Sequence, residues 1–429
     1  DARQAYVQSK LGGTETWVEL PKELQPAHFA AFRRPVVLLV MSLYGHPDAG
    51  GYWQLHSFKV ITDLDFIEIE GWPSLFWNPE TRVLIISYVD DFKVAGPKHV
   101  VAKLWKELQK KIDLDPPKPA SRFLGCEHVA AKTFNGIEHF WHMKDFMKQC
   151  VDRYLELAPA GTKLKTVKTP FLNSESLSES DHVETGVLNT DAAKILMKIL
   201  FGARVARPDI LRAVCGLASD VSRWSRANDK MLFRLVSYIN STLSLCLRGF
   251  LSKDVTPQDL ALDLYADADF AGDSESGRST TGGFGCVVSP KVFWPVAFKT
   301  AKQTCVSTST PEAELVSASS VLKGIGIPLA DLFDHLLGRP TRLNFYEDNS
   351  TCITAIRAGQ SPTMRHLKRC HNVSLKWLHD VLTQNSSFVL LPCASSDMIA
   401  DIFTKPFPDK KLVTWNQLCS LLGMKVYNG

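Results

Sequence analysis

Residues 262–273 read LDLYADADFAGD, and this stretch decides the fold of the C-terminal half. Ahead of Asp267 apolar and polar residues alternate, which is the pattern of a half-buried strand. Carboxylates are depleted in strands, so Asp267 and Asp269 near the strand end call for a chemical explanation. A rigid strand holds oxygen ligands accurately for a hard cation such as Mg²⁺. The alternative is a solvated strand end with two aspartates of no function.

Three further acids, Glu314, Asp348 and Asp401, each lie where a predicted element begins or ends. Thr310 followed by Pro311 is typical of a helix start, which places Glu314 about one turn into that helix. The acids lie in or next to a succession of predicted elements. In order, these are a helix from Thr310, a strand over 343–346, a helix over 351–357, a strand over 389–391 and a helix over 398–403.

Two more strands are predicted over 282–288 and 292–298, after the one that carries Asp267. Three strands, then helix, strand, helix, strand and helix, with acids at four junctions, resemble the ribonuclease H fold. The segments STSTPEAEL (307–315), EDNSTCITA (347–355) and MIADIFTKPFP (398–408) look most like the ribonuclease H of copia-type retrotransposon polyproteins. The resemblance implies two Mg²⁺ ions, with Mn²⁺ as an alternative, that hydrolyse the RNA strand of an RNA/DNA hybrid. Asp267 would bridge the two ions, and the implied ligands are Asp267, Glu314, Asp348 and Asp401.

The segment 365–371, RHLKRCH, combines basic residues with His and Cys. A zinc site is disfavoured, because the spacing does not match a zinc finger and no second cysteine pair accompanies it. The resemblance implies instead that Arg365, His366 and Lys368 bind the backbone of the hybrid substrate.

Residues 82–96, RVLIISYVDDFKVAG, predict a hydrophobic hairpin with Asp90 and Asp91 at its turn. An Asp-rich polar turn is common without any function. Tyr-Val-Asp-Asp is, however, similar to the palm signature of reverse transcriptases, and Asp1 with Tyr6 resembles that family's other metal-binding motif. The resemblance implies that Asp1 and Asp90 ligate two Mg²⁺ ions, that Asp91 supports the site, and that Tyr6 stacks on the sugar of the incoming nucleotide.

Two features depart from the polymerase pattern. The loop 46–50, HPDAG, lacks the glutamine and the basic residue usual in the family, so we assign no template- or nucleotide-binding residue to it. The chain starts at Asp1, so we expect the strand that leads into this motif, and the polymerase fingers, to be missing.

Composition sets broad limits on the protein. The chain has 429 residues, 45% hydrophobic and 22% charged, which fits two or three globular domains. A net charge of +4 permits a polyanionic partner. Ten scattered cysteines favour reduced thiols in an intracellular protein. The resemblance to a retrotransposon polyprotein implies a cytoplasmic particle or the nucleus. The longest apolar run, 36–44, is too short for a bilayer, and no secretory leader is recognised, so we expect no membrane association and no secretion.

We expect a multidomain protein of the α+β and α/β classes. The predicted domains are a reverse-transcriptase palm with the start of a thumb (1–160), a mostly helical thumb and connection (161–250), a ribonuclease H-like mixed sheet with flanking helices (251–410) and a C-terminal tail (411–429). Arginines at 212, 223, 226 and 234 suit a duplex backbone, although ordinary solvated arginines explain each equally well.

The leading hypothesis is an N-terminally truncated reverse transcriptase–ribonuclease H portion of a copia-type Pol polyprotein. Its expected partners are an RNA template, a DNA primer, the RNA/DNA hybrid, deoxynucleoside triphosphates and other segments of the polyprotein. One alternative is a ribonuclease H whose palm serves only as a scaffold. Another is a nucleic-acid-binding remnant without catalysis. A transposase or integrase is disfavoured, because it would need a three-acid pattern of different order and spacing.

Overall fold

The computed structural model describes residues 1–273 and 275–427. The chain divides into two compact units, Asp1–Ala120 and Ser121–Gly429. Each unit has its own hydrophobic core.

The first unit is built on an antiparallel sheet of four strands in the order β3-β4-β5-β6, and a smaller sheet pairs β1 with β2. Its strands are β1 (Trp17–Glu19), β2 (Val36–Leu38), β3 (Ile67–Glu68), β4 (Leu75–Asn78), β5 (Val83–Tyr88) and β6 (Asp91–Ala95). Its helices are α1 (Ala49–Thr62) and α2 (Lys98–Gln109), with 3₁₀ turns at Ala5–Gln8, Lys22–Leu24 and Ala27–Ala31.

The hairpin predicted over 82–96 forms from β5 and β6, with Tyr88 paired to Asp91 across the turn. Alternate residues of β5 are buried, Val83 and Ile85 among them. They share a core with Trp53 of α1 and with side chains of α2. The alternating sequence therefore packs one face of this hairpin against the helices.

The second unit contains one sheet of ten strands in the order β15-β14-β11-β12-β13-β10-β9-β8-β7, with β16 also paired to β10. The strands are β7 (Arg122–Phe123), β8 (Cys126–Lys132), β9 (Gly136–His142), β10 (Leu245–Ser252), β11 (Ala261–Asp269), β12 (Thr280–Ser289), β13 (Val292–Lys302), β14 (Leu343–Glu347), β15 (Phe388–Pro392) and β16 (Met424–Val426).

Five of these strands follow the succession that the sequence predicts for a ribonuclease H-like sheet. The strands β11, β12 and β13 are antiparallel neighbours, whereas β14 runs parallel to β11 and β15 parallel to β14. A helix separates β13 from β14, and others separate β14 from β15, as parallel pairing requires. The predicted mixed α and β multidomain class is confirmed.

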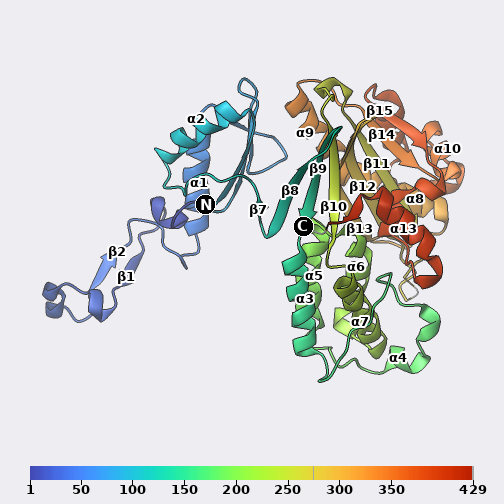
Figure 1. The fold of residues 1–429 in the computed structure, drawn as a ribbon, viewed down its shortest axis with the longest axis horizontal. Helices are drawn as coiled ribbons and strands as arrows, with labels where there is room; N and C mark the ends of the chain where they lie inside the picture. The colour runs from blue at the N-terminus through green and yellow to red at the C-terminus, as the bar shows by residue number, and fades with distance from the viewer. Residues whose placement is uncertain (274, 428–429) are drawn as a thin grey trace. The chain divides into compact units, whose positions relative to one another are not determined.

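Helices flank this sheet and gather beyond one end of it (Figure 1). Among them α3, α5, α6 and α7 pack on one another and share the main core with the sheet. The helices are α3 (Lys144–Leu157), α4 (Glu179–Val183), α5 (Ala192–Val205), α6 (Leu211–Ala218), α7 (Arg226–Ser241), α8 (Thr310–Val321), α9 (Ile327–Leu337), α10 (Ser350–Ala358), α11 (Leu367–Cys370), α12 (Leu375–His379) and α13 (Leu412–Leu421).

Shorter helical turns complete the unit. The 3₁₀ turns are Ser174–Ser176, Pro208–Ile210, Val221–Arg223, Pro257–Asp259, Pro362–Met364, Ser395–Asp397, Ile399–Phe403 and Asp409–Lys411. Two π-helical turns are Leu322–Gly326 and Asp380–Gln384.

A buried ion pair fixes the junction of α5 with α6. The Arg207 guanidinium donates from Nε and Nη2 to the two carboxylate oxygens of Asp209, at 2.9 and 2.8 Å. The Tyr238 hydroxyl of α7 donates to Asp209 at 3.0 Å. Buried charges need such partners, so this turn fixes the relative positions of α5, α6 and α7.

The boundaries predicted at 160, 250 and 410 all fall inside the second unit, and the division at Ala120 was not predicted. The pairing of β9 with β10, and of β10 with β13, joins all these segments in one sheet. The C-terminal β16 pairs with β10 as well. These segments associate because an unpaired strand edge exposes hydrogen-bonding groups, and neighbouring strands satisfy them.

The run Thr310–Leu337 joins α8, a π-helical turn and α9 into a helix long and apolar enough to cross a membrane by length and composition. In the described part of the chain it is the one helix that passes this test. Its most apolar window is 61% buried inside the protein. Because buried core helices pass the same test, this is weak evidence for a membrane span.

Candidate metal centre

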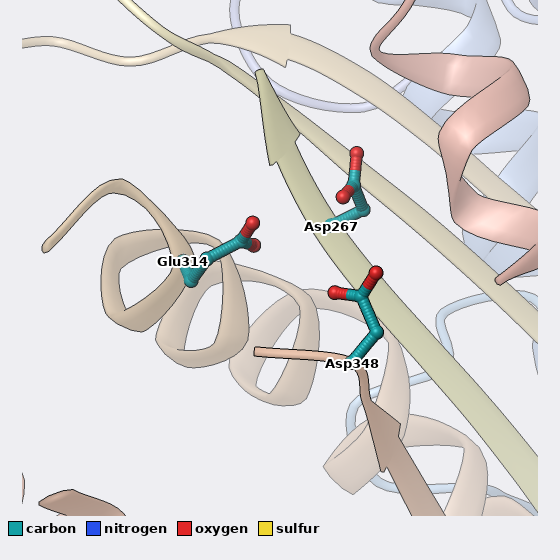
Figure 2. A group of neighbouring side chains, drawn as sticks. All are labelled: Asp267, Glu314 and Asp348. Carbon is teal, nitrogen blue, oxygen red and sulfur yellow. The ribbon is translucent and has the colours of Figure 1, made fainter. Parts of the chain in front are cut away.

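Three carboxylates from separate elements converge in the second unit. Asp267 lies in β11, Glu314 in α8, and Asp348 directly after β14. One oxygen from each of the three lies within 4.8 Å of the others, and Figure 2 shows the three side chains around one space. In the ranges 1–273 and 275–427, no other set of three or more such side chains meets this criterion. We call Asp267, Glu314 and Asp348 the carboxylate triad.

Local hydrogen bonds position the helix that carries Glu314. The Ser309 side chain caps α8 by accepting the N–H of Glu312, and Pro311 occupies the first turn. The Ser317 hydroxyl donates to the main-chain carbonyl of Asp267 at 2.7 Å. This bond attaches α8 to β11, so the two acids are held on neighbouring elements.

Asp348 is placed by the start of the next helix. The Asn349 side chain caps α10 by accepting the N–H of Cys352 at 3.0 Å. The Ser395 hydroxyl donates to the Asp348 carboxylate at 2.8 Å. The turn from strand to helix therefore presents Asp348 at the end of β14, where the sequence predicted it.

Burial makes the triad costly without a cation. Asp267 is 1% and Glu314 3% exposed, and one Glu314 oxygen, Oε2, has no hydrogen-bond partner. Burial raises the pKa of Glu314 strongly, and the nearby carboxylates Glu347, Asp267 and Asp348 raise it further. An all-oxygen donor set with an unpaired buried oxygen fits a hard divalent ion such as Mg²⁺ or Mn²⁺.

Asp401 lies beside the triad but is not part of it. The 3₁₀ helix Ile399–Phe403 carries it, and its Oδ1 lies 2.6 Å from the Lys405 Nζ. The same ammonium lies 3.2 Å from Asp267 Oδ1, and the Thr404 hydroxyl donates to Asp267 Oδ2. Burial and the Asp267 charge raise the pKa of Asp401 to about 7, although Lys405 opposes the shift.

Sequence reasoning missed Thr404, Lys405 and Glu347. Lys405 follows Asp401 by four residues, a spacing that predicts an ion pair on one helix face. Glu347 is fully buried, and its Oε2 has no partner. Its position in phase with the buried Leu343 and Phe345 of β14 was the available signal.

Glycine at 282 lets the segment with Asp401 approach the sheet. Gly282 of β12 pairs with Asp267 of β11. A Cβ there would lie 2.5 Å from the Thr404 methyl carbon and 2.8 Å from the Ala400 carbonyl oxygen. Any larger residue would therefore push this segment away from Asp267.

The predicted substrate-binding residues occupy different environments. Arg365 and Lys368 are exposed. His366 is half-buried, and its Nε2 lies 3.1 Å from Oε1 of the buried Glu312. The Nε2 of His371 lies 2.9 Å from the same oxygen. The segment is thus attached to the start of α8, and the predicted contact with a hybrid backbone stays a prediction.

The four arginines predicted to suit a duplex are all paired with acids of the second unit. Arg212 lies 3.6 Å from Asp269, and Arg234 lies 2.6 Å from Asp409. The remaining pairs are Arg223 with Asp220 and Glu275, and Arg226 with Asp181 and Glu184. Each of these positive charges therefore already has an acidic partner within the second unit.

In the first unit the turn of the hairpin lies next to the chain start. The N–H of Ala2 donates to the main-chain carbonyl of Asp90 at 2.7 Å, which places Asp1 beside this turn. Asp1 and Asp90 are exposed, and Asp91 is half-buried at the start of β6. The structure brings the predicted residues to one region without forming a group like the triad among the described residues.

Backbone strain marks the same turn. Val89 has φ +56°, a left-handed conformation that β-branched residues rarely adopt. The Trp53 indole N–H donates to the Val89 carbonyl at 2.5 Å. Tyr6 packs on Tyr44, with ring centroids 4.6 Å apart, and its contact with a nucleotide stays a prediction. The bond from Trp53 therefore attaches the hairpin turn to α1.

No protein-family model matches the chain. The chain is 24% identical over 437 aligned residues to the retrovirus-related Pol polyprotein of transposon TNT 1-94 from Nicotiana tabacum. This alignment covers 99% of the chain and 30% of the polyprotein. Pol polyproteins of transposons RE1 and RE2 from Arabidopsis thaliana are 25% and 26% identical over 395 residues, covering 89% of the chain and 25% of each polyprotein. The chain thus spans less than a third of these relatives.

Two solved structures of low similarity were also found. The foamy viral protease–reverse transcriptase dRH in complex with double-stranded DNA has 11% identity and a TM-score of 0.42, covering 84% of this chain and 52% of that one. The foamy viral protease–reverse transcriptase in complex with an RNA/DNA hybrid has 12% identity and a TM-score of 0.41, covering 92% and 46%. The resemblance to copia-type Pol polyproteins is confirmed by the transposon relatives.

Proposed function

We propose that this chain, a relative of copia-type Pol polyproteins, cleaves the RNA strand of RNA/DNA hybrids at the carboxylate triad. The observation that carries the proposal is the convergence of Asp267, Glu314 and Asp348 within 4.8 Å, from three elements of a ribonuclease H-like sheet. The relatives support an enzyme of the reverse transcriptase and ribonuclease H kind.

The residues of the triad have distinct roles in this proposal. Asp267, Glu314 and Asp348 line one cavity, where their carboxylates would hold a divalent ion, and Glu314 contributes its unpaired Oε2. When bound, Mg²⁺ supplies an activated water and neutralises charge on the phosphate under attack. The Thr404 hydroxyl donates a hydrogen bond to Oδ2 of Asp267, and this bond orients the Asp267 carboxylate.

The two-ion arrangement expected from the resemblance is part of this proposal. Asp267 would be the ligand common to both ions, because it belongs to the triad and also shares the neighbour Lys405 with Asp401. The proposed substrate is an A-like hybrid, read through its 2′-hydroxyls. All ten cysteines are free, which supports an intracellular location.

A second candidate function is RNA-directed DNA synthesis at the hairpin of the first unit. It is favoured by the hydrogen bond that brings the chain start beside Asp90. In this proposal Asp1 and Asp90 hold two Mg²⁺ ions, Asp91 supports them, and Tyr6 contacts the nucleotide sugar. Template, primer and deoxynucleoside triphosphates are the proposed ligands. A palm that serves only as a scaffold is the competing proposal.

Parallel assays on one preparation separate these functions. Cleavage of a labelled RNA/DNA hybrid in Mg²⁺ tests the nuclease, with Asp267→Asn as the inactive variant and the exposed Asp254→Asn as matched control. Primer extension, with Asp90→Asn, tests the polymerase. Cleavage without extension supports the nuclease with a scaffold palm, whereas binding of the hybrid with neither activity would support a non-catalytic protein.

A further inference from the structure

A lysine ammonium lies between two of the acids implied in metal binding. Lys405 Nζ is 2.6 Å from Asp401 Oδ1 and 3.2 Å from Asp267 Oδ1. Both distances are those of charge-assisted contacts. The positive charge of Lys405 is therefore positioned where an ion bridging Asp267 and Asp401 would have to lie.

Local structure explains this position. The Lys405 N–H donates to the Asp401 carbonyl at 2.9 Å, so the chain makes a helical turn between them. Residues four apart on such a turn share one face. The adjacent Thr404 hydroxyl donates to Asp267 Oδ2. Both oxygens of Asp267 thus have partners from one segment.

Glu314 is different, because within residues 1–273 and 275–427 no cationic side chain lies within ion-pairing distance of its carboxylate. Glu314 keeps one buried oxygen without a partner. Two neighbouring positions for cations therefore differ in kind: one is lined by three carboxylates, and the other already contains an ammonium group.

We propose that Lys405 supplies the cation between Asp267 and Asp401 when no nucleic acid is bound, so that the free protein binds one divalent ion and admits a second only after Lys405 withdraws. This inference rests on the proposed nuclease function. In this inference Lys405 determines how many divalent ions the free protein binds. The four implied ligands alone would give no reason for the free protein to bind one ion rather than two.

Lys405 is able to withdraw. Its side chain is 36% exposed and lines the same cavity of about 390 Å³ as the triad. A flexible four-carbon stem carries the charge, so the ammonium can leave both carboxylates by rotation. A phosphodiester of bound nucleic acid is the anion suited to receive it.

The test counts Mn²⁺ ions bound per chain, by electron paramagnetic resonance of free Mn²⁺, without reference to activity. We expect one ion for the wild type and two for Lys405→Met. Lys405→Arg keeps the charge and should bind one, which separates charge from packing. Lys291→Met, an exposed lysine between β12 and β13, is the matched control and should bind one.

Two further measurements locate the second ion. Adding Asp401→Asn to Lys405→Met should return the count to one, because the second ion loses a ligand. Saturating the wild type with a hybrid of DNA and 2′-O-methyl RNA should raise the count from one to two. Binding of two ions by the free wild type, or of one by Lys405→Met, would overturn the inference.

The outcomes also separate this inference from the function on which it rests. If neither the wild type nor Lys405→Met bound any Mn²⁺, the proposed nuclease centre would fail. If both bound one ion and the wild type cleaved hybrid, the nuclease would stand and the role of Lys405 would be excluded. Far-ultraviolet circular dichroism of each variant verifies that it is folded.

Discussion

Arg212 donates its Nε–H to the main-chain carbonyl of Thr404 at a distance of 2.8 Å. Arg212 belongs to α6, in the helical segment, whereas the Thr404 hydroxyl donates to Asp267 in the triad. The same guanidinium lies 3.6 Å from Asp269, two residues beyond Asp267. A helix outside the ribonuclease H-like strands thus contacts both the segment that binds Asp267 and the end of β11.

Replacing Arg212 should therefore weaken cleavage without removing a ligand. Groups that orient metal ligands typically contribute 10- to 100-fold to activity or metal affinity, so we expect about a 10- to 100-fold loss for Arg212→Met. Hybrid cleavage and Mn²⁺ affinity measure it. Arg204→Met, an exposed arginine on α5, is the control. Equal activity of the two variants would show that α6 does not support the site.

The buried Glu347 should make stability depend on pH in an unusual direction. Burial raises the pKa of Glu347 to about 8, and Asp348 and Asp267 add to the shift, whereas the Asn349 N–H opposes it. An acid whose pKa is higher in the folded state stabilises the fold fully below its unfolded pKa. This stabilisation is lost as pH rises through the folded pKa, here between about pH 4 and pH 8.

Glu347→Gln removes this titration and keeps the acceptor for the Asn349 N–H. The free energy of unfolding of the variant, relative to wild type, should therefore increase from pH 5 to pH 8 in the presence of a chelator. Denaturant titrations at several pH values measure it, with the exposed Glu179→Gln as control. A difference that is constant across this range would exclude the proposed burial effect.

Gly282→Ala should separate the segment with Asp401 from β11. The added methyl would lie too close to Thr404 and Ala400, and overpacking of this kind costs about 1–3 kcal/mol. We expect lower stability and slower hybrid cleavage. In contrast, Gly51→Ala in α1 meets no atom within 4 Å and should not destabilise its helix. Wild-type behaviour of Gly282→Ala would mean that this contact relaxes freely.

The strained turn at Val89 predicts a stabilising substitution. A left-handed conformation costs a residue with a Cβ about 1–2 kcal/mol, and Asn tolerates it better than Val. Val89→Asn should therefore raise the stability of the first unit by about 1 kcal/mol. Thermal unfolding measures it, with the exposed Val40→Asn as control. A destabilised Val89→Asn would show that the side chain of Val89 matters more than its backbone strain.

The triad was predictable because each acid lies at a boundary that local sequence marks. Alternation identifies β11 and so places Asp267, and the Thr-Pro helix start places Glu314. The pairing of β9 with β10 was not predictable, because alternation shows that a strand exists and does not name its partner.

The sequence also did not predict contacts between side chains that lie far apart along the chain. The stretch near 174–181 is rich in Ser and Glu, yet within it Asp181 is buried and accepts a hydrogen bond from the Lys230 ammonium at 2.6 Å. Its partner lies far along the chain, so composition alone could not reveal it. Lys405 was missed for a related reason, since its role depends on Asp267 as well as on the nearby Asp401.

Cleavage of a labelled RNA/DNA hybrid in Mg²⁺ by the wild type and by Asp267→Asn tests the central claim most directly. We expect cleavage of the RNA strand by the wild type and by the control Asp254→Asn. We expect none from Asp267→Asn, although that variant should still bind the hybrid. Equal cleavage by Asp267→Asn, or no cleavage by folded wild-type protein, would contradict a nuclease centred on the carboxylate triad.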